Sequence, residues 1–160
     1  LVDKIENIGR KNKVLMCADS QSSSQVGDIA RFKNMKLISP TEREARISVQ
    51  DFDCGLIVLA EKLIARSNAE NILLTIGDEG VIIYATKNAV ITDKIKALNS
   101  NPKDVSGAGD SMLVCASLAL ACGASIWEAS IIGSIGASFQ VSRIGNTPLN
   151  QKEFITLLQS

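Results

Sequence analysis

The sequence predicts an α/β protein in which a mostly parallel sheet, with an antiparallel edge, is layered with helices. Short apolar runs bounded by polar or turn-forming residues alternate with segments of helical period along residues 13–92. Beyond residue 108 the pattern changes to long segments of small and apolar residues, which is typical of buried helices. No repeat or linker interrupts the 160 residues, so we expect a single α/β domain over 1–160 with its own core.

The expected strands are short apolar runs that end at turn signals. The first is followed by a serine-rich loop at 20–24, and the second is stopped by Ser39-Pro40. The third is the most apolar and leads into the turn Gly77–Gly80. In chain order the expected strands are Lys13–Ala18, Met35–Ile38, Asn71–Ile76, Val81–Ala85 and Ala89–Thr92.

The expected helices begin at capping signals or carry an apolar stripe. Thr41 and Glu44 form a capping-box pattern ahead of a short helix that ends near Ser48. Apolar residues recur at helical spacing from Leu56 to Ile64, which predicts a helix over Asp53–Arg66. The remaining expected helices are Gly109–Cys122, Ile126–Val141 and Gln151–Leu158.

Composition excludes several classes of protein. Lys+Arg and Asp+Glu are balanced at 17 each and aromatic content is 4%, so neither a basic footprint nor a base-stacking surface for nucleic acid is present. Ser111–Trp127 is too short and too rich in small polar residues for a membrane span, so we expect no membrane association. The four cysteines form no C-x-x-C pair, which favours small buried side chains in a reducing cytoplasm. The chain has no histidine, so general-base catalysis falls first to Asp or Glu.

The segment Asp104-Val105-Ser106-Gly107-Ala108-Gly109-Asp110 is the most informative of the chain. Its glycines let backbone N–H groups approach a ligand, and a helix that begins there adds its positive dipole end. Asp110 places a carboxylate beside this anion cradle, which is the arrangement that phosphoryl transfer needs. Neither a Rossmann fingerprint nor a Walker A loop fits, because Met112 stands where Gly or Ala would be and no Gly-Lys-Ser/Thr follows. The alternative is a tight turn in which Asp110 only favours a helix N-terminus.

Three further motifs each have a functional and a structural interpretation. Thr75-Ile76-Gly77-Asp78-Glu79-Gly80 ends a strand in a glycine turn, which suits either a nucleotide site or an ordinary hairpin. In Ser39-Pro40-Thr41-Glu42-Arg43-Glu44, Glu44 suits either the water shell of Mg²⁺ or a capping box. The small residues of Gly133-Ser134-Ile135-Gly136-Ala137-Ser138 permit close approach of a flat ligand or of another helix.

Taken in this order, these motifs resemble those of the PfkB family of carbohydrate kinases, which have the ribokinase-like, three-layer αβα, Rossmann-like fold. Residues 104–110 resemble the family's D-T-x-G-A-G-D signature, residues 75–80 its T-x-G-x-x-G turn and residues 39–44 its P-N-x-x-E segment. Val141-Ser142-Arg143-Ile144-Gly145 is similar to its V-x-x-x-G tail. The chain departs from the family at Thr41 and Ser134, where Asn is usual, and at Cys115, where a small Gly is usual. Val14–Asp19 and the Pro-Thr-Glu-Arg-Glu-Ala segment resemble the heptose-phosphate kinases within this family.

The resemblance implies a role for each of these positions in an ATP-dependent sugar kinase. Asp110 would be the catalytic base, and the amides of Gly107, Ala108 and Gly109 would hold the transferring phosphoryl group. The nucleotide would be bound by Thr75, Gly77, Gly80 and, near the adenine or ribose, Ser134. Glu44 would organise Mg²⁺ through water, and Asp104 would help to hold a monovalent cation such as K⁺.

The resemblance spans the whole chain but corresponds to the C-terminal half of such a kinase. The expected substrate is a sugar or sugar phosphate, most of whose contacts would come from an N-terminal half with a lid, outside these residues. The resemblance is also compatible with a homodimer of the full-length enzyme. Two other classes stay open: a nucleotide-binding module without catalysis, and a structural α/β domain whose glycines only pack.

Overall fold

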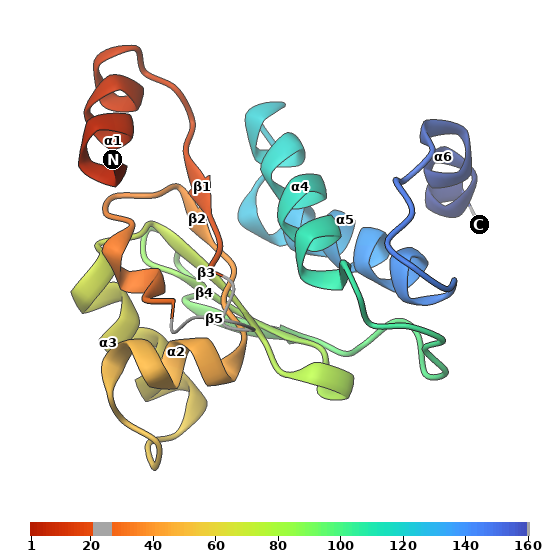
Figure 1. Ribbon diagram of the computed structural model, residues 1–160, viewed down its shortest axis with the longest axis horizontal. Coiled ribbons are helices and arrows are strands. Elements are labelled where there is room, and N and C mark those ends of the chain that lie inside the picture. The colour runs from red at the N-terminus through yellow and green to blue at the C-terminus, as the bar shows by residue number, and fades with distance from the viewer. Residues whose placement is uncertain (21–26, 160) are drawn as a thin grey trace. The chain divides into compact units, whose positions relative to one another are not determined.

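The computed structural model describes residues 1–20 and 27–159, and Figure 1 traces the order of its elements. Residues 21–24 of the expected serine-rich loop lie outside the described part. The chain forms two compact units. The first comprises Leu1–Ile76 and Ile82–Lys94, and the second comprises Gly77–Val81 and Ile95–Ser160.

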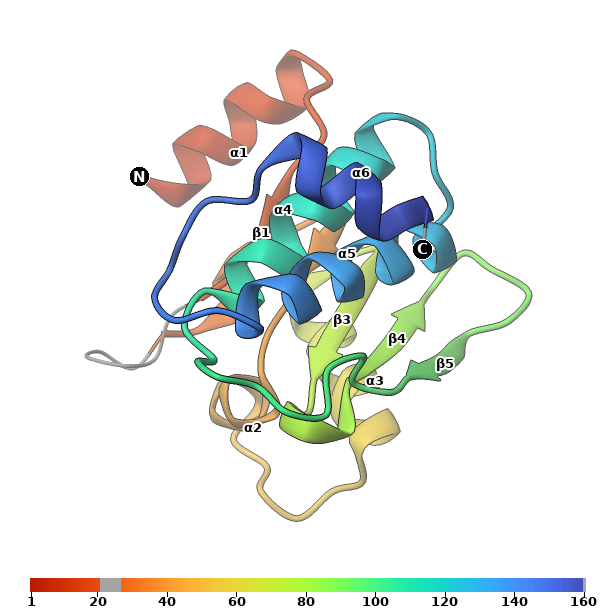
Figure 2. The same ribbon diagram turned by 90° about the vertical axis from the view of Figure 1, so that its right-hand side faces the viewer.

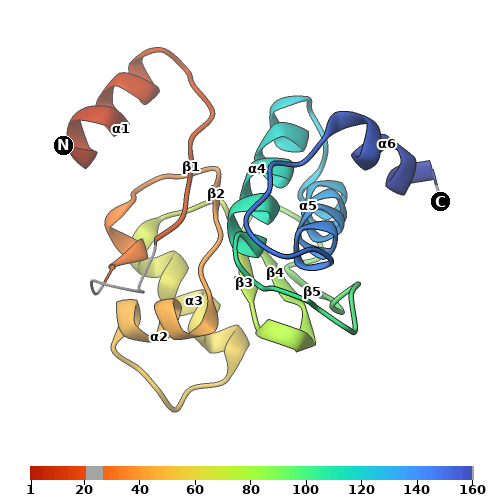
Figure 3. The ribbon, with the colours of Figure 1, turned by 45° about the vertical axis from the view of Figure 1, so that its right-hand side comes forward.

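The sheet is built almost entirely from the first unit. Its strands follow one another in chain order, β1 to β5, and β2 pairs in parallel with both β1 and β3 (Figure 3). The later strands are joined by connections too short for a parallel crossover, so the sheet is mixed, as predicted. Apolar side chains of β3 are fully buried at Ile72, Leu73 and Leu74. The strands are Cys17–Ala18 (β1), Leu37–Ile38 (β2), Asn71–Thr75 (β3), Val81–Ala85 (β4) and Thr92–Ile95 (β5).

Helices α2 (Glu42–Val49) and α3 (Leu56–Ser67) lie on one side of this sheet in Figure 3. Both contact β3, and Ala45, Leu59 and Leu63 of these helices are buried in the core. A short 3₁₀ helix at Ile29–Arg31 packs against both helices. Buried apolar side chains on these elements therefore hold a helical layer on the sheet.

Helix α3 begins three residues later than the sequence pattern predicts. The carboxylate of Asp51 accepts hydrogen bonds from the backbone N–H groups of Asp53 and Cys54, at 3.1 and 3.0 Å. This local turn competes with helical hydrogen bonding, so the helix begins only after Gly55.

Helix α1 (Val2–Lys11) was missed by the sequence analysis. Its apolar residues Ile5 and Ile8 are about half exposed, whereas the carboxylate of Glu6 is buried and accepts a hydrogen bond from the Lys33 amide at 2.7 Å. The expected strand over Lys13–Ala18 is correspondingly wrong over its first four residues. Lys13 has a positive φ of 54°, which closes the helix, and only Cys17–Ala18 pair as a strand.

The expected strand Ala89–Thr92 is also wrong except at Thr92. Val90 and Ile91 are apolar but exposed, because they lie in the connection between β4 and β5. The Ala85 amide donates to the carbonyl of Ile91 at 2.8 Å, which closes this connection, and β5 begins at the next residue, Thr92. Apolar content alone therefore does not separate a strand from the connection beside it.

The second unit is mainly helical. Helices α4 (Ala108–Ala121) and α5 (Ile126–Val141) run side by side, and α6 (Gln151–Gln159) contacts α5 (Figure 2). Ser125 and Glu128 form a full capping box at the start of α5. The predicted bounds of these three helices are confirmed to within one residue. No helix among the described residues is long and apolar enough to cross a membrane.

Candidate functional site

The loop before α4 exposes an uncapped helix N-terminus. Gly107 occupies the N-cap position with a φ of +76°, and no side chain of the described residues caps the helix. The amide of Ala108 donates to the carbonyl of Val105 at 3.2 Å, so one of the three amides expected to hold an anion is already engaged. The next amides, of Gly109 and Asp110, precede the first intrahelical bond, which Ser111 makes to Gly107 at 3.0 Å. No acceptor among the described residues engages the amides of Gly107, Gly109 and Asp110, so three N–H groups and the positive end of the helix dipole are open to an anion.

Asp110 lies in the first turn of α4, beside these amides. Its side chain is exposed, and no hydrogen bond or ion pair with another described residue engages its carboxylate. A carboxylate in this state can accept a proton from a hydroxyl group that is brought to it. The local geometry therefore combines an anion cradle with an unengaged base.

Asp104 braces the same loop from the opposite end. One carboxylate oxygen accepts from the Ser106 amide and the other from the Gly145 amide, both at 2.9 Å. These contacts lower the pKa of Asp104 below its ordinary value, first through the Ser106 backbone and then through the Ser106 hydroxyl and the Gly145 amide. Asp104 therefore links the loop before α4 to the segment that follows α5.

The side chain of Gln140 reinforces this connection, and the sequence analysis missed it. Gln140 is only 1% exposed, and its amide nitrogen donates to the carbonyls of Ser106 and Gly145 at 3.2 and 3.1 Å. Arg143 in turn donates to the side-chain oxygen of Gln140 at 3.2 Å. The available signal was a polar residue within the apolar stretch of α5, directly before the Val141–Gly145 tail.

The turn between β3 and β4 depends on two glycines with positive φ. Gly77 has a φ of +66° and Gly80 one of +103°, and the Gly80 amide donates to the Gly77 carbonyl at 3.1 Å. A Cβ atom at Gly80 would lie 2.1 Å from the carbonyl oxygen of Ile95, so backbone passes directly against it. Both glycines belong to the second unit, as does the loop before α4.

Thr75 and Glu44 lie together in the first unit. Thr75 ends β3, where its amide donates to the Pro40 carbonyl at 3.0 Å and where it is bridged to Thr41. One oxygen of Glu44 accepts from the amide and the hydroxyl of Thr41, both at 2.8 Å, which completes the predicted capping box. The other oxygen of Glu44 accepts no hydrogen bond from the described residues.

This donor set is compatible with Mg²⁺ that is held mainly by phosphate and water. No group of three or more acidic, cysteine or histidine side chains that could hold a metal occurs among residues 1–20 and 27–159. Mg²⁺ bound with a nucleotide needs only one or two carboxylates, often through water. The unengaged oxygen of Glu44 can supply such a contact.

The small residues of α5 pack the helix against α4. A Cβ atom at Gly133 would lie 3.0 Å from the Met112 carbonyl, and one at Gly136 would lie 2.7 Å from the sulfur of Cys115. The glycines therefore follow the packing interpretation of this motif. Ser134 between them is buried, and its hydroxyl has no hydrogen-bond partner among the described residues.

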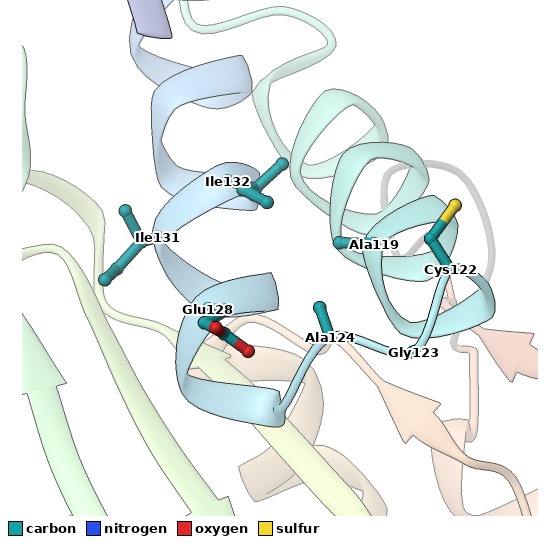
Figure 4. A pocket seen from close by; sticks show the side chains of 7 residues that line it. All are labelled: Ala119, Cys122, Gly123, Ala124, Glu128, Ile131 and Ile132. Carbon is teal, nitrogen blue, oxygen red and sulfur yellow. The ribbon is translucent and has the colours of Figure 1, made fainter.

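A hollow of the second unit lies at the turn between α4 and α5 (Figure 4). It has a volume of about 560 Å³. Its lining residues are Ala119, Cys122, Gly123, Ala124, Glu128, Ile131 and Ile132. None of the predicted site residues lines it, and Gly107 lies at the opposite end of α4.

A family model described as "pfkB family carbohydrate kinase" matches residues 1–153. Among curated proteins, Bifunctional protein HldE of Campylobacter concisus is 30% identical over 154 residues, covering 94% of this chain and 31% of that protein. HldE of Geobacter metallireducens is 25% identical over 152 residues, covering 92% and 30% of the two chains. The chain thus spans about 30% of the length of these relatives.

Solved structures match the fold at lower identity. Phosphofructokinase-2 from Escherichia coli in complex with potassium has a TM-score of 0.80 at 18% identity, covering 99% of this chain and 51% of that chain. Ribokinase from Thermotoga maritima has a TM-score of 0.80 at 19% identity, and Arabidopsis thaliana ribokinase complexed with ribose and ATP has 0.81 at 17%. These likenesses confirm the predicted ribokinase-like α/β fold, and the match to the family model over residues 1–153 places this chain in the pfkB family of carbohydrate kinases.

Proposed function

We propose that this chain is the nucleotide-binding and catalytic-base portion of an ATP-dependent sugar kinase. The observation that carries the proposal is the loop before α4, where backbone amides and the carboxylate of Asp110, none of them engaged by another described residue, occur in one turn. Membership of a carbohydrate kinase family supports phosphoryl transfer as the chemistry of that loop. The acceptor would be a hydroxyl group of a sugar or sugar phosphate.

In this proposal Asp110 takes the proton from the attacking hydroxyl group. The amides of Gly107, Gly109 and Asp110 stabilise charge on the transferring phosphoryl group, with Ala108 holding the turn through its bond to Val105. Such positioning and electrostatic stabilisation are the main contributions that a protein makes to phosphoryl transfer.

The nucleotide would lie along the turn of Thr75, Gly77 and Gly80, whose glycines allow close backbone approach to phosphates. Ser134, whose buried hydroxyl has no partner in the described part of the chain, is the proposed contact to the adenine or ribose. Bound Mg²⁺ would neutralise phosphate charge, and Glu44 would orient water molecules of its shell.

A heptose phosphate is the narrower proposal for the acceptor. It is supported by the resemblance of residues 14–19 and 40–45 to heptose-phosphate kinases and by the matches to proteins named HldE. A panel of heptose, hexose and pentose substrates tested with the natural full-length protein would decide it. The same preparation, run by analytical ultracentrifugation, would test whether the enzyme is a homodimer.

The test of the catalytic role is Asp110→Asn in the natural full-length protein. We expect turnover to fall by roughly 10²–10⁴-fold, the usual contribution of a positioned general base. Binding of ADP, measured by calorimetry, should persist because the backbone amides remain. Asp3→Asn is the matched control, since Asp3 is also an exposed carboxylate in the first turn of a helix.

Three outcomes would count against this function. Retained turnover in Asp110→Asn would remove the aspartate from the mechanism. Nucleotide binding without sugar phosphorylation in the unmodified protein would favour a binding module. If neither ATP nor ADP raised the melting temperature, a structural role would be favoured, because ligands of the native state stabilise it.

A further inference from the structure

Oxygen atoms gather where the loop before α4 meets the end of α5. They are the two carboxylate oxygens of Asp104 and the carbonyl oxygens of Ser106 and Gly145. Carboxylate and carbonyl oxygens are the ligands that hard cations prefer. On residue types alone, this cluster would suit the monovalent cation that the family resemblance implies at Asp104.

The hydrogen bonds at this cluster do not fit a bound cation. Both oxygens of Asp104 accept from backbone amides at 2.9 Å, and the two carbonyls accept from the side-chain nitrogen of Gln140 at 3.2 and 3.1 Å. The nitrogen of Gln140 therefore lies between the two carbonyls, at the position from which a cation would contact both. The side-chain NH₂ group of Gln140 therefore already supplies the positive charge density that the carbonyl oxygens of Ser106 and Gly145 would receive from a cation.

The orientation of the Gln140 amide is determined by Arg143. A guanidinium group can only donate, so the side-chain oxygen of Gln140 must face Arg143 and its NH₂ group must face the carbonyls. The fixed charge of Arg143 also polarises the amide, which strengthens the hydrogen bonds on its far side. Arg143 is held in turn by the carbonyls of Thr147 and Pro148.

We propose that the side-chain amide of Gln140, oriented by Arg143, substitutes for a monovalent cation in holding the loop before α4. Gln140 is then a positioning residue, which acts on the reaction through the carbonyl of Ser106 and the loop that leads to Asp110. The proposal rests on the proposed function for its catalytic consequence, but its structural part does not depend on it. It predicts a loop whose order is independent of K⁺, unlike a loop that is assembled around a bound ion.

The test compares wild type with Gln140→Ala in the natural full-length protein, in KCl and in NaCl at constant ionic strength. The primary measurement is amide hydrogen exchange at Ser106 and Gly145, whose N–H groups are bound by Asp104. In wild type, exchange should be the same in both salts. In NaCl, Gln140→Ala should exchange roughly tenfold faster, the effect of losing hydrogen bonds to two partly buried carbonyls, and KCl should reverse this change.

Gln140→Glu is the second variant, because it keeps the size of the side chain and replaces the donor by an oxygen. Exchange in this variant should also become slower in KCl than in NaCl, because a carboxylate oxygen would then face the carbonyl oxygens of Ser106 and Gly145 and a cation would be needed between them. Gln151→Ala, at an exposed glutamine in α6, should respond to neither salt. In the kinase assay, kcat of both Gln140 variants should be lower in NaCl than in KCl, whereas kcat of wild type and of Gln151→Ala should be the same in both salts. The KM for ATP should change less than kcat.

Three results would overturn the proposal. The first is slower exchange at Ser106 and Gly145 of wild type in KCl than in NaCl. The second is an exchange rate in Gln140→Ala equal to that of wild type in NaCl. The third is faster exchange in both Gln140 variants that KCl does not reverse. Failure of the proposed function would appear separately, as absence of phosphorylation with the hydrogen-exchange pattern intact.

Discussion

The two glycines of the turn between β3 and β4 should differ sharply in their tolerance of alanine. At Gly77 a Cβ atom would have no neighbour within 4 Å among residues 1–20 and 27–159, so Gly77→Ala carries only the strain of a φ of +66°. That strain is about 1 kcal/mol. At Gly80 the φ of +103° is less favourable, and the Cβ atom would lie 2.1 Å from the Ile95 carbonyl oxygen and 2.7 Å from the Ala97 nitrogen. Backbone strain of ~1–3 kcal/mol and overpacking of ~1–3 kcal/mol then add to about 4 kcal/mol.

Thermal and urea unfolding monitored by circular dichroism would measure this difference. For a chain of this size 1 kcal/mol shifts the Tm by about 2–4 °C, so we expect Gly77→Ala to lower it by about 3 °C and Gly80→Ala by about 12 °C. Gly123→Ala is a further control, since its φ is +92° and no atom of the described residues lies within 4 Å of the added Cβ. Equal losses for Gly77→Ala and Gly80→Ala would refute the reasoning from the Ile95–Ala97 contact. Because Gly77→Ala should stay folded, a loss of its affinity for ADP could not be caused by unfolding and would test the proposed nucleotide turn directly.

The remaining predictions concern packing, pH and thiol chemistry. Gly136→Ala should destabilise the protein by about 2 kcal/mol, and adding Cys115→Ala should recover part of this, because the new Cβ would meet the Cys115 sulfur at 2.7 Å; additive losses in denaturant titrations would contradict the contact. The hydrogen bond from Lys62, with two backbone amides, holds the pKa of Asp51 well below its ordinary 3.8, so its stabilisation is complete above that pH and is lost as the pH falls below it. The Tm difference between wild type and Asp51→Asn should therefore narrow as the pH drops through 3.8, and a constant difference would argue against the ion pair. Burial raises the pKa of the Cys115 thiol whereas Cys122 is exposed, so iodoacetamide followed by mass spectrometry should label Cys122 first; equal labelling would show that α4 and α5 open readily.

The elements that the sequence predicted best are those specified by neighbours along the chain. The capping box of Thr41 and Glu44 forms as its residue spacing predicts, and α5 occupies its predicted residues, Ile126–Val141. A cap depends on residues three positions apart, so composition and spacing are sufficient to recognise it. The prediction failed at α1 and β5, because burial by distant residues decides whether an apolar stretch such as Val90-Ile91 pairs or lies in a turn.

For the candidate site, the local sequence predicted the loop before α4 but not the hydrogen bonds that hold it. The uncapped turn with Gly107 at positive φ and Asp110 in the first turn of α4 is readable from two glycines ahead of a long helix. The engagement of the Ala108 amide by Val105 is a detail of the turn that residue types do not reveal. The roles of Glu44, Thr75 and Ser134 toward a nucleotide stay predictions.

The sequence by itself therefore determined the family, the order of most elements and the identity of the leading catalytic candidate, since each follows from a short motif. Only the tertiary structure decided what holds the loop in place. Asp104 meets Gly145 across 41 residues, and Gln140 meets Ser106 across 34. Such contacts form because α4 and α5 pack on one another through Gly133 and Gly136, which brings the end of α5 to the start of α4. A hydrogen bond between distant residues depends on that packing, and no local pattern at either residue encodes it.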